Sequence, residues 1–292
     1  MANVYQHILA AQHKLLAVLI DPDKNTEESL LQLIQQAERC KVDLFFVGGS
    51  LLVEDSFEHT VSTIKQHSAI PVVIFPGSNY QISAKADALL FLSLISGRNA
   101  EYLIGQHVAA APIIKEHKLE TIATGYMLID GGRISTTSYI TQTVPIPADK
   151  PDIAVATALA GQMLGMQVIY LEAGSGAHAH VSAAMVKAVK QNINIPLIVG
   201  GGIRSATFNL GVLQALSELK LLAEFEDEPL VRRSVRQAIE AGVGAVTVIT
   251  GHRSGAEITH GAWRHVCGHG DIALAAHQHQ LDGSGVVTGV HE

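Results

Sequence analysis

Cysteines, aromatic residues and long apolar runs are all scarce in this chain. Its 292 residues include two cysteines and one tryptophan, and aromatic residues make up 5%. Two thiols, in a chain whose start lacks the pattern of a secretory leader, argue against a disulfide framework and predict that Cys40 and Cys267 stay reduced. The longest obvious apolar run, 88–92, ends at Ser93. This argues against a membrane-spanning helix and predicts a cytoplasmic protein.

Charged residues are scarce as well, and the negative net charge limits the kinds of molecule that the chain can bind. Charged residues make up 16% of the chain and the net charge is −7. An acidic balance argues against a broad nucleic-acid-binding surface, because such surfaces carry an excess of Lys and Arg. The length and the 48% hydrophobic content fit one large α/β domain.

Short apolar runs alternate along the chain with amphipathic stretches, the pattern of a parallel sheet covered by helices. We expect a helix capped by Asn25 and Glu28, and a second one after it. Their buried positions are Leu30, Leu31, Ile34 and Ala37 in the first, and Phe57, Val61 and Ile64 in the second. The predicted strands are Leu15–Ile20, Leu44–Val47, Val72–Phe75, Ala88–Leu94, Thr121–Ile129, Gln167–Leu171, Pro196–Val199 and Ala245–Thr250. Eight such strands predict a (β/α)8 TIM barrel, whose chemistry lies at the carboxyl ends of its strands.

Two connections break the alternation. Residues 76–87 hold Pro, Gly, Ser and Asn and leave little room for a helix. We therefore expect a modified barrel in which the third helix is replaced by a short segment that leaves a groove. Residues 131–151 are too long for an ordinary connection. They are either a substrate-covering loop or an excursion of the chain.

Polar residues and glycines follow the predicted strands. The segments are Asp21-Pro22-Asp23-Lys24, Gly48-Gly49-Ser50, Pro76-Gly77-Ser78, Glu172 with its glycines, and Gly200-Gly201-Gly202-Ile203-Arg204. Each segment alone fits a structural turn. In a barrel they share one rim, where glycines allow close approach to a phosphate and carboxylates supply a metal ligand and a base. Glu172, directly after a buried strand, is the candidate base.

These segments, together with Ser93-Leu94-Ile95-Ser96-Gly97-Arg98-Asn99, resemble those of the geranylgeranylglyceryl phosphate synthase family. The matching motifs run in order from about Leu16 to Ser205, some two thirds of the chain. The resemblance implies a modified barrel with the third helix replaced. It also implies transfer of a prenyl group, expected to be geranylgeranyl, from its diphosphate to sn-glycerol 1-phosphate, with Mg²⁺ as the cofactor.

Residue roles follow from the same resemblance. Asp21 and Ser50 would hold Mg²⁺, and Glu172 would accept the proton of the attacking hydroxyl. The implied contacts to glycerol phosphate are Tyr170, Leu171, Glu172, Ala173, Gly174, Ser175, Gly176, Gly201, Gly202, Gly251 and His252. The implied partners are these two small-molecule substrates and further copies of the chain. A peripheral contact with a membrane surface is compatible with a lipid product.

Several residues near the motifs have a plainer explanation. Asp23 and Lys24 are either contacts to the diphosphate or a solvated turn pair. Arg98 and Asn99 fit a helix cap better than a substrate contact. His178 and His180 lie two residues apart, but no third ligand follows at a suitable spacing, which argues against zinc.

The C-terminal third departs from the family pattern. We expect the barrel domain to span 1–254 with a helical insertion at about 210–240, and 255–292 to form a His- and Gly-rich, poorly ordered tail. His252 stands where the family has a small polar residue. Two other functions therefore stay open: another phosphate-binding barrel enzyme, a lyase or isomerase, and a catalytically silent scaffold that binds phosphate.

Overall fold

The computed structural model describes residues 3–11, 14–49, 52, 56–175, 177–201, 224–225, 228–229 and 246–250, the last three ranges as backbone only. The chain divides into two compact units, Met1–Ile258 and Thr259–Glu292. The second unit, which holds most of the predicted tail, lies outside the described residues. The expected boundary after residue 254 stays a prediction, and the description below concerns the first unit.

Among the described residues, eight strands close into a barrel in the order β1-β10-β7-β6-β5-β4-β3-β2. The strands from β1 to β7 pair in parallel. Their bounds are β1 Leu15–Ile20, β2 Leu44–Val47, β3 Val72–Ile74, β4 Ala88–Leu94, β5 Glu120–Leu128, β6 Val168–Glu172, β7 Leu197–Gly200 and β10 Val246–Thr250. The predicted barrel is confirmed, with strand ends displaced by at most one residue.

The closing strand β10 departs from a regular barrel because it runs antiparallel to both of its neighbours. Its residue Ile249 pairs with Leu15 of β1, and Thr250 pairs with Leu197 of β7. An antiparallel strand satisfies the backbone groups of the two open edges as well as a parallel one does. Thr250, the last residue of β10, therefore lies at the amino ends of the parallel strands.

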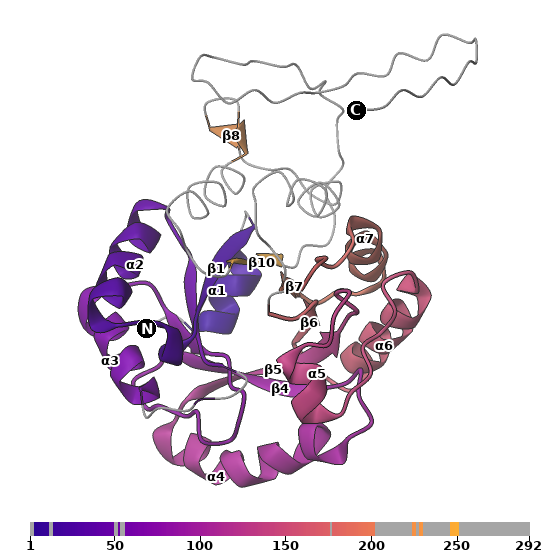
Figure 1. The fold of residues 1–292 in the computed structure, drawn as a ribbon, viewed down its shortest axis with the longest axis horizontal. Helices are drawn as coiled ribbons and strands as arrows, with labels where there is room; N and C mark the ends of the chain where they lie inside the picture. Colours follow the sequence, from indigo (N-terminus) through magenta and orange to yellow (C-terminus); the bar gives the residue numbers. More distant parts are fainter. Residues whose placement is uncertain are drawn as a thin grey trace, which may run out of the picture. The chain divides into compact units, whose positions relative to one another are not determined.

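Helices surround the strands, as Figure 1 shows. The longer ones are α2 Glu27–Arg39, α3 Phe57–His67, α4 Gln106–His117, α6 Pro151–Met163 and α7 Ala183–Asn192. The shorter ones are α1 Val4–Ala10, α5 Thr136–Thr141, a 3-10 turn η1 Pro22–Lys24 and a π turn η2 Glu101–Gly105. No helix in the described part of the chain is long and apolar enough to cross a bilayer.

The predicted helical faces are buried, but one predicted cap is wrong. The core includes Leu30, Ile34 and Ala37 of α2 and Phe57, Val61 and Ile64 of α3, whereas Leu31 is only partly buried. The N-cap of α2 is Thr26, whose hydroxyl accepts a hydrogen bond from the Ser29 amide at 3.2 Å. Asn25 stands one position before this cap, and its side chain donates to the Asp21 carbonyl at 2.9 Å.

The core has two layers. Inside the barrel, residues such as Phe46, Leu90 and Tyr170 form one cluster, which Val4 and Ile8 of α1 join. The Glu120 carboxylate accepts hydrogen bonds from the first amides of α1, at 2.7 Å from Val4 and 2.9 Å from Tyr5. A carboxylate there satisfies the unpaired amides of the helix start and its positive end. Alternate strand residues form the second layer, against the helices.

The irregular connections follow the sequence expectations in part. No helix lies between β3 and β4, so the short third connection is confirmed. The excursion after β5 holds α5 and returns to the sheet, where Ile146 bridges to Ile129. Of the predicted insertion at 210–240, the structure describes β8 Glu224–Phe225 and β9 Glu228–Pro229, an antiparallel pair rather than helix.

Candidate active site at the barrel rim

Glu172 is the last residue of β6, and its carboxylate is buried at the rim. The residue is 7% exposed. Oε1 accepts a hydrogen bond from the Gly174 amide at 2.7 Å, and the Tyr170 hydroxyl donates a second bond to the carboxylate. Burial raises the pKa of Glu172 to about 7, although both hydrogen bonds act to lower it. A carboxyl group with this pKa can act as a general base near neutral pH.

Glycines beside Glu172 leave space for its carboxylate and for the Tyr170 hydroxyl. A Cβ on Gly201 would overlap Glu172 Oε1, and a Cβ on Gly200 would overlap the Tyr170 hydroxyl. Gly201 also has a φ of +77° and Gly174 a φ of +99°, which side chains with a Cβ rarely adopt. These glycines let the chain turn closely around the carboxylate.

Aromatic rings pack below and beside the carboxylate. Tyr126 on β5 pairs in register with Tyr170 on β6, and their ring centroids are 5.4 Å apart. The ring of Phe75 lies 5.3 Å from Tyr170 and 5.9 Å from Tyr126. The Tyr126 hydroxyl hydrogen-bonds to Thr137 of α5, and burial, then the charges of Glu172 and Tyr170, raise the pKa of Tyr126. The cluster fixes the position of Tyr170, which in turn holds Glu172.

Asp21 follows β1 at the same end of the barrel. Its Oδ2 lies 2.7 Å from Lys24 Nζ, and its Oδ1 accepts from the Asp23 amide at 3.3 Å. A Cβ on Gly49, after β2, would lie 3.1 Å from Asp21 Oδ1. Since β1 and β6 belong to one set of parallel strands, Asp21 and Glu172 face the same mouth, as the predicted mechanism requires.

Gln81 of the third connection holds the next two loops together. Its Oε1 accepts from the amides of Gly49 at 3.3 Å and Gly77 at 3.1 Å, while its Nε2 donates to the Gly49 carbonyl at 2.8 Å. This buried amide therefore replaces the missing helix as the link between the ends of β2 and β3. No periodic pattern in the sequence singles out Gln81.

The rim residues fit a magnesium ion that also binds a substrate. In the described part of the chain, no group of three or more His, Cys, Asp or Glu side chains could hold a metal. Mg²⁺ commonly takes one or two carboxylates and completes its shell with phosphate oxygens and water. The partly exposed Asp21 carboxylate suits that mode, and a site made only of protein ligands does not.

A mostly apolar groove opens beside this mouth, where the third helix is missing. Its inner end reaches Gly49 and Tyr126. Its walls come from the third connection, β4, α4 and α5, and include Ile82, Leu90, Leu92, Tyr102, Ala110 and Ile114. His107 also lines it, with its ring against Phe91 at 4.4 Å, and burial lowers the pKa of this histidine. Burial thus disfavours a positive charge on His107 in the groove.

Apart from Asp21, the predicted site residues fall into four groups. Tyr170, Glu172, Gly174 and Gly201 come together as described. Leu171 and Ala173 face the other way, into the layer between strands and helices, so only their backbone can serve the site. The Gly174 amide serves Glu172, and Ser175 is exposed in the loop that follows. Ser50, Gly176, Gly202, Gly251 and His252 lie outside the described residues, and their roles stay predictions.

Sequence reasoning missed Tyr126, Thr137, Gln81 and the groove walls. Tyr126 carried a usable signal, because it stands two residues before the end of its strand, as Tyr170 does. Thr137 and Gln81 lie in irregular connections whose path no local pattern predicts.

The open alternatives beside the motifs are partly decided. Asn99 Oδ1 accepts from the Glu101 amide at 3.1 Å, so Asn99 satisfies a backbone group at the start of η2, whereas Arg98 donates to the Gly97 carbonyl at 2.7 Å and does not act as a cap. Its Nδ2 donates to the Thr141 carbonyl at 3.1 Å, which ties α5 to this turn. Asp23 accepts from the Ser56 hydroxyl at 3.1 Å, which favours a turn role for it.

Comparison with known proteins decides the family, because the PcrB family matches residues 8–216. The chain belongs to the PcrB family. This PcrB-family chain is 50% identical over 206 residues to the geranylgeranylglyceryl phosphate synthase of Spirosoma linguale, covering 70% of this chain and 83% of that one. It is 40% identical over 217 residues to the synthase of Methanosphaera stadtmanae, covering 74% and 88%.

Solved structures agree. The synthase of Thermoplasma acidophilum, in complex with sn-glycerol-1-phosphate, superposes on this PcrB-family chain with a TM-score of 0.72 and 32% identity. The comparison covers 84% of this chain and 99% of that one. The wild-type enzyme of Thermoplasma volcanium gives a TM-score of 0.71 at 29% identity, covering 83% and 98%. The resemblance seen in the motifs is therefore confirmed over residues 8–216.

Proposed function

We propose that this chain is a geranylgeranylglyceryl phosphate synthase, which transfers a prenyl group from its diphosphate to sn-glycerol 1-phosphate. The observation that carries the proposal is the position of Glu172, a buried base at a rim that also borders an apolar groove. To use glycerol phosphate as the prenyl acceptor, the enzyme needs a base and a phosphate-binding site. To bind the prenyl donor, it needs an apolar channel. The relatives with this name support the same reaction.

In the proposed reaction, the primary hydroxyl of glycerol phosphate attacks C1 of the prenyl group. The new bond joins that oxygen to C1, and the bond from C1 to the diphosphate oxygen breaks. The hydroxyl proton passes to Glu172, whose raised pKa makes it a competent acceptor near pH 7. The Tyr170 hydroxyl, bonded to the same carboxylate, keeps it oriented.

The phosphate of the acceptor fits the loop with few side chains at Gly174 and Gly201. Positive φ values there turn the backbone at the rim, and backbone amides at such turns bind anions. In TIM barrels, phosphate sites commonly lie near the ends of the last strands, and β7 ends at Gly200. The missing Cβ atoms keep the loop close to the base.

The diphosphate would lie at the opposite side of the mouth, near Asp21 and the end of β2. Mg²⁺ bound there by Asp21 and Ser50 would neutralise charge on the leaving diphosphate. Lys24 contacts Asp21 and adds a positive charge at this position. The prenyl chain would extend from here into the groove past Tyr126.

Two further predictions belong to this proposal. We expect the enzyme to act in the cytoplasm and to assemble into homo-oligomers. Analytical ultracentrifugation of the full chain would measure the assembly.

The direct test is incubation with labelled glycerol 1-phosphate, Mg²⁺ and a series of prenyl diphosphates of increasing length, followed by mass spectrometry of the products. We expect an ether-linked prenylglyceryl phosphate, formed fastest with geranylgeranyl diphosphate, and no product without Mg²⁺. Binding of glycerol phosphate with no ether from any donor would instead indicate the silent scaffold.

A further inference from the structure

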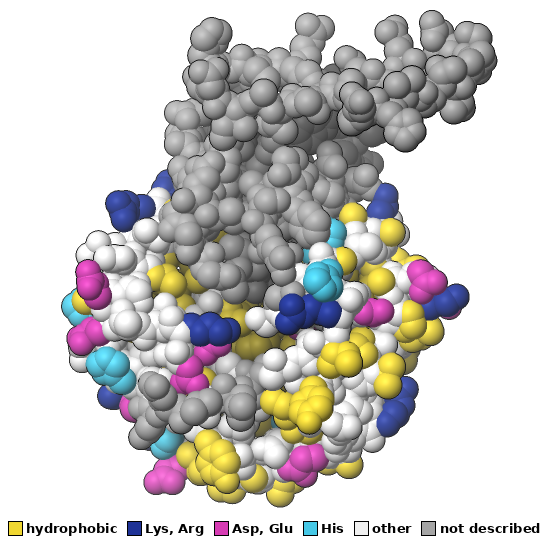
Figure 2. All heavy atoms as spheres, viewed as in Figure 1, with side chains coloured by type: hydrophobic (Ala, Val, Ile, Leu, Met, Phe, Trp, Pro, Cys, Tyr) yellow, Lys and Arg dark blue, Asp and Glu magenta, His cyan; other side chains and the backbone are white. Residues whose placement is uncertain are grey.

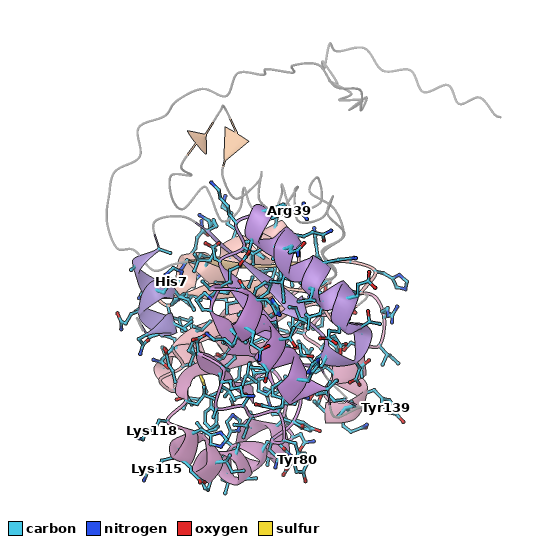
Figure 3. All side chains as sticks on the ribbon, turned by 90° about the vertical axis from the view of Figure 1, so that its left-hand side faces the viewer. His7, Arg39, Tyr80, Lys115, Lys118 and Tyr139 are labelled. Carbon is cyan, nitrogen blue, oxygen red and sulfur yellow. The ribbon has the colours of Figure 1, made fainter. Side chains whose placement is uncertain are left out.

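Exposed apolar side chains surround the opening of the groove. Tyr80 is 88% exposed and Tyr139 is 71% exposed, and Ile104 and Val108 are exposed as well. Each stands one or two positions from a residue that lines the groove, namely Asn79, Gln106 or Ile140. Figure 3 shows Tyr80 and Tyr139 pointing outward, away from the end of α4 marked by Lys115 and Lys118. We call Tyr80, Ile104, Val108 and Tyr139 the groove-mouth surface.

The third connection, η2, α4 and α5 carry this surface, and hydrogen bonds link them around the opening. The Asn79 amide donates to Gln106 Oε1 at 3.3 Å, which joins the third connection to α4. The bond from Asn99 to the Thr141 carbonyl joins α5 to the turn before α4. The outward direction of the apolar side chains is therefore set by a linked frame around the opening.

Between Tyr102 and Ile114 the surface carries no acidic or basic side chain apart from His107, and the exposed Glu101 that precedes this stretch accepts a hydrogen bond from Gln106 Nε2. Several residues of this stretch are nevertheless exposed. By contrast, exposed positions of α2 include Glu27, Glu28, Glu38 and Arg39, as on an ordinary solvent-facing helix. Figure 2 shows hydrophobic side chains over the lower part of the rim face, where α4 and the third connection lie, with a few acidic side chains among them.

The chemistry of the groove favours a lipid bilayer as the occupant of this surface. Under the proposed function, on which this inference rests, both the donor and the product carry a long apolar chain and a charged head. Such molecules reside in bilayers, and the chain must pass the groove opening to enter or leave. Tyrosines and apolar side chains at that opening suit the boundary between lipid heads and tails.

We propose that the groove-mouth surface docks on the surface of a lipid bilayer, so that prenyl chains pass between bilayer and groove without crossing water. The net charge of −7 gives no general attraction to anionic lipids. Docking is therefore apolar: it occurs on zwitterionic vesicles, is no stronger on anionic ones, and persists in high salt.

The test is flotation of the full chain with phosphatidylcholine vesicles, with and without phosphatidylglycerol. The wild type floats with both. The variant Tyr80→Ser/Tyr139→Ser partitions roughly tenfold more weakly, because two aromatic side chains no longer enter the interface. The matched control is Met163→Ser/Leu164→Ser, which removes two similarly exposed apolar side chains at the end of α6, a helix that does not line the groove, and floats like the wild type. Ile104→Ser is a second groove-mouth variant, expected to weaken flotation to a smaller extent.

Three results overturn the proposal. They are a wild type that stays with the soluble fraction, a Tyr80→Ser/Tyr139→Ser variant that floats like the wild type, and an oligomer that dissociates only in that variant. The last result would assign the surface to a second copy. Ether formation from short, soluble geranyl diphosphate is measured in parallel. Its absence contradicts the proposed function, whereas flotation reports on docking alone.

Discussion

The two sides of the barrel mouth are built in opposite ways. At the ends of β6 and β7, glycines remove side chains so that the backbone can turn around Glu172. On the groove side, large apolar side chains from β4, α4 and the third connection form the walls, and no helix covers them. Under the proposed function, the side at β6 and β7 binds the small charged phosphate through its backbone. The groove side holds the prenyl chain through its side chains.

This difference predicts how the two sides respond to substitution. At the glycines around Glu172, an added side-chain atom is expected to displace the carboxylate and so to impair proton transfer. In the groove walls, an added side-chain atom is expected to change which prenyl chain fits and to leave proton transfer intact. The predictions below test that separation, beginning with the largest effect.

Glu172→Gln should lower kcat for ether formation roughly 10²- to 10⁴-fold, because the amide keeps the shape but cannot accept a proton. Binding of glycerol 1-phosphate, measured by calorimetry, should change little. Glu116→Gln, which alters an exposed carboxylate near the end of α4, is the control and should retain wild-type activity. Normal turnover in Glu172→Gln would exclude Glu172 as the base.

Gly201→Ala should reduce kcat by roughly a hundredfold, because its Cβ would displace the Glu172 carboxylate. The matched control is Gly165→Ala. Gly165 has a similarly positive φ of +91°, but no atom lies within 4 Å of an added Cβ. The control should lose only about 1–2 kcal/mol of unfolding free energy and keep its activity. Equal losses of activity in Gly201→Ala and Gly165→Ala would show that backbone strain, and not displacement of the Glu172 carboxylate, causes the loss.

Ala110→Phe should shift the preference for prenyl length without removing the chemistry. Ala110 lies on α4 with its side chain in the groove wall, so a phenyl ring there shortens the channel. The ratio of kcat/KM for geranylgeranyl over geranyl diphosphate should fall roughly tenfold. Ala109→Phe, at the exposed neighbouring position, should leave the ratio unchanged. A parallel loss with both donors would argue against this groove as the chain site.

Asp21→Asn should raise the Mg²⁺ concentration needed for half-maximal activity by roughly tenfold, because the amide lacks the charge of the carboxylate. The measurement is a magnesium titration at saturating substrates. Asp23→Asn is the matched control, since that carboxylate is bonded to Ser56 instead. Unchanged metal dependence in Asp21→Asn would remove Asp21 from the metal site.

Tyr170→Phe should have the smallest effect, a severalfold loss at pH 7. Its hydroxyl stabilises the charged form of Glu172, so its removal raises the pKa of Glu172 further. The acid limb of the rate profile should therefore move to higher pH. Tyr126→Phe removes a hydroxyl bonded to Thr137 and should leave that limb closer to the wild type. An unmoved limb in Tyr170→Phe would show that this hydroxyl does not act on Glu172.

Much of the fold could be read from the sequence, because buried parallel strands are short apolar runs with polar ends. The strand that carries Glu172 and the short third connection were both visible in this way. The N-cap at Thr26 was missed because Asn25 has similar capping ability, and the bond from the Ser29 amide to the Thr26 hydroxyl, which decides between them, is visible only in the structure. The direction of β10 has no local signal, since antiparallel and parallel strands share the same apolar pattern.

The site itself was only partly predictable. Glycine loops and the acidic residues Asp21 and Glu172 follow strands directly, so their place at the rim comes with the barrel topology. The raised pKa of Glu172 depends on burial by residues far away in the chain, and Gln81 and Thr137 act through contacts across loops. The groove walls likewise combine elements whose packing no single segment encodes.

The pH dependence of kcat for ether formation by the wild-type chain, from about pH 5 to pH 9, is the most direct test of a buried carboxylate base. Below its pKa the carboxyl group is protonated and cannot accept the hydroxyl proton, so the rate should rise through pH 7, where the pKa of Glu172 lies, and level off above it. A rate that is flat over this range, or that levels off near the pKa of an exposed glutamate, would contradict the account.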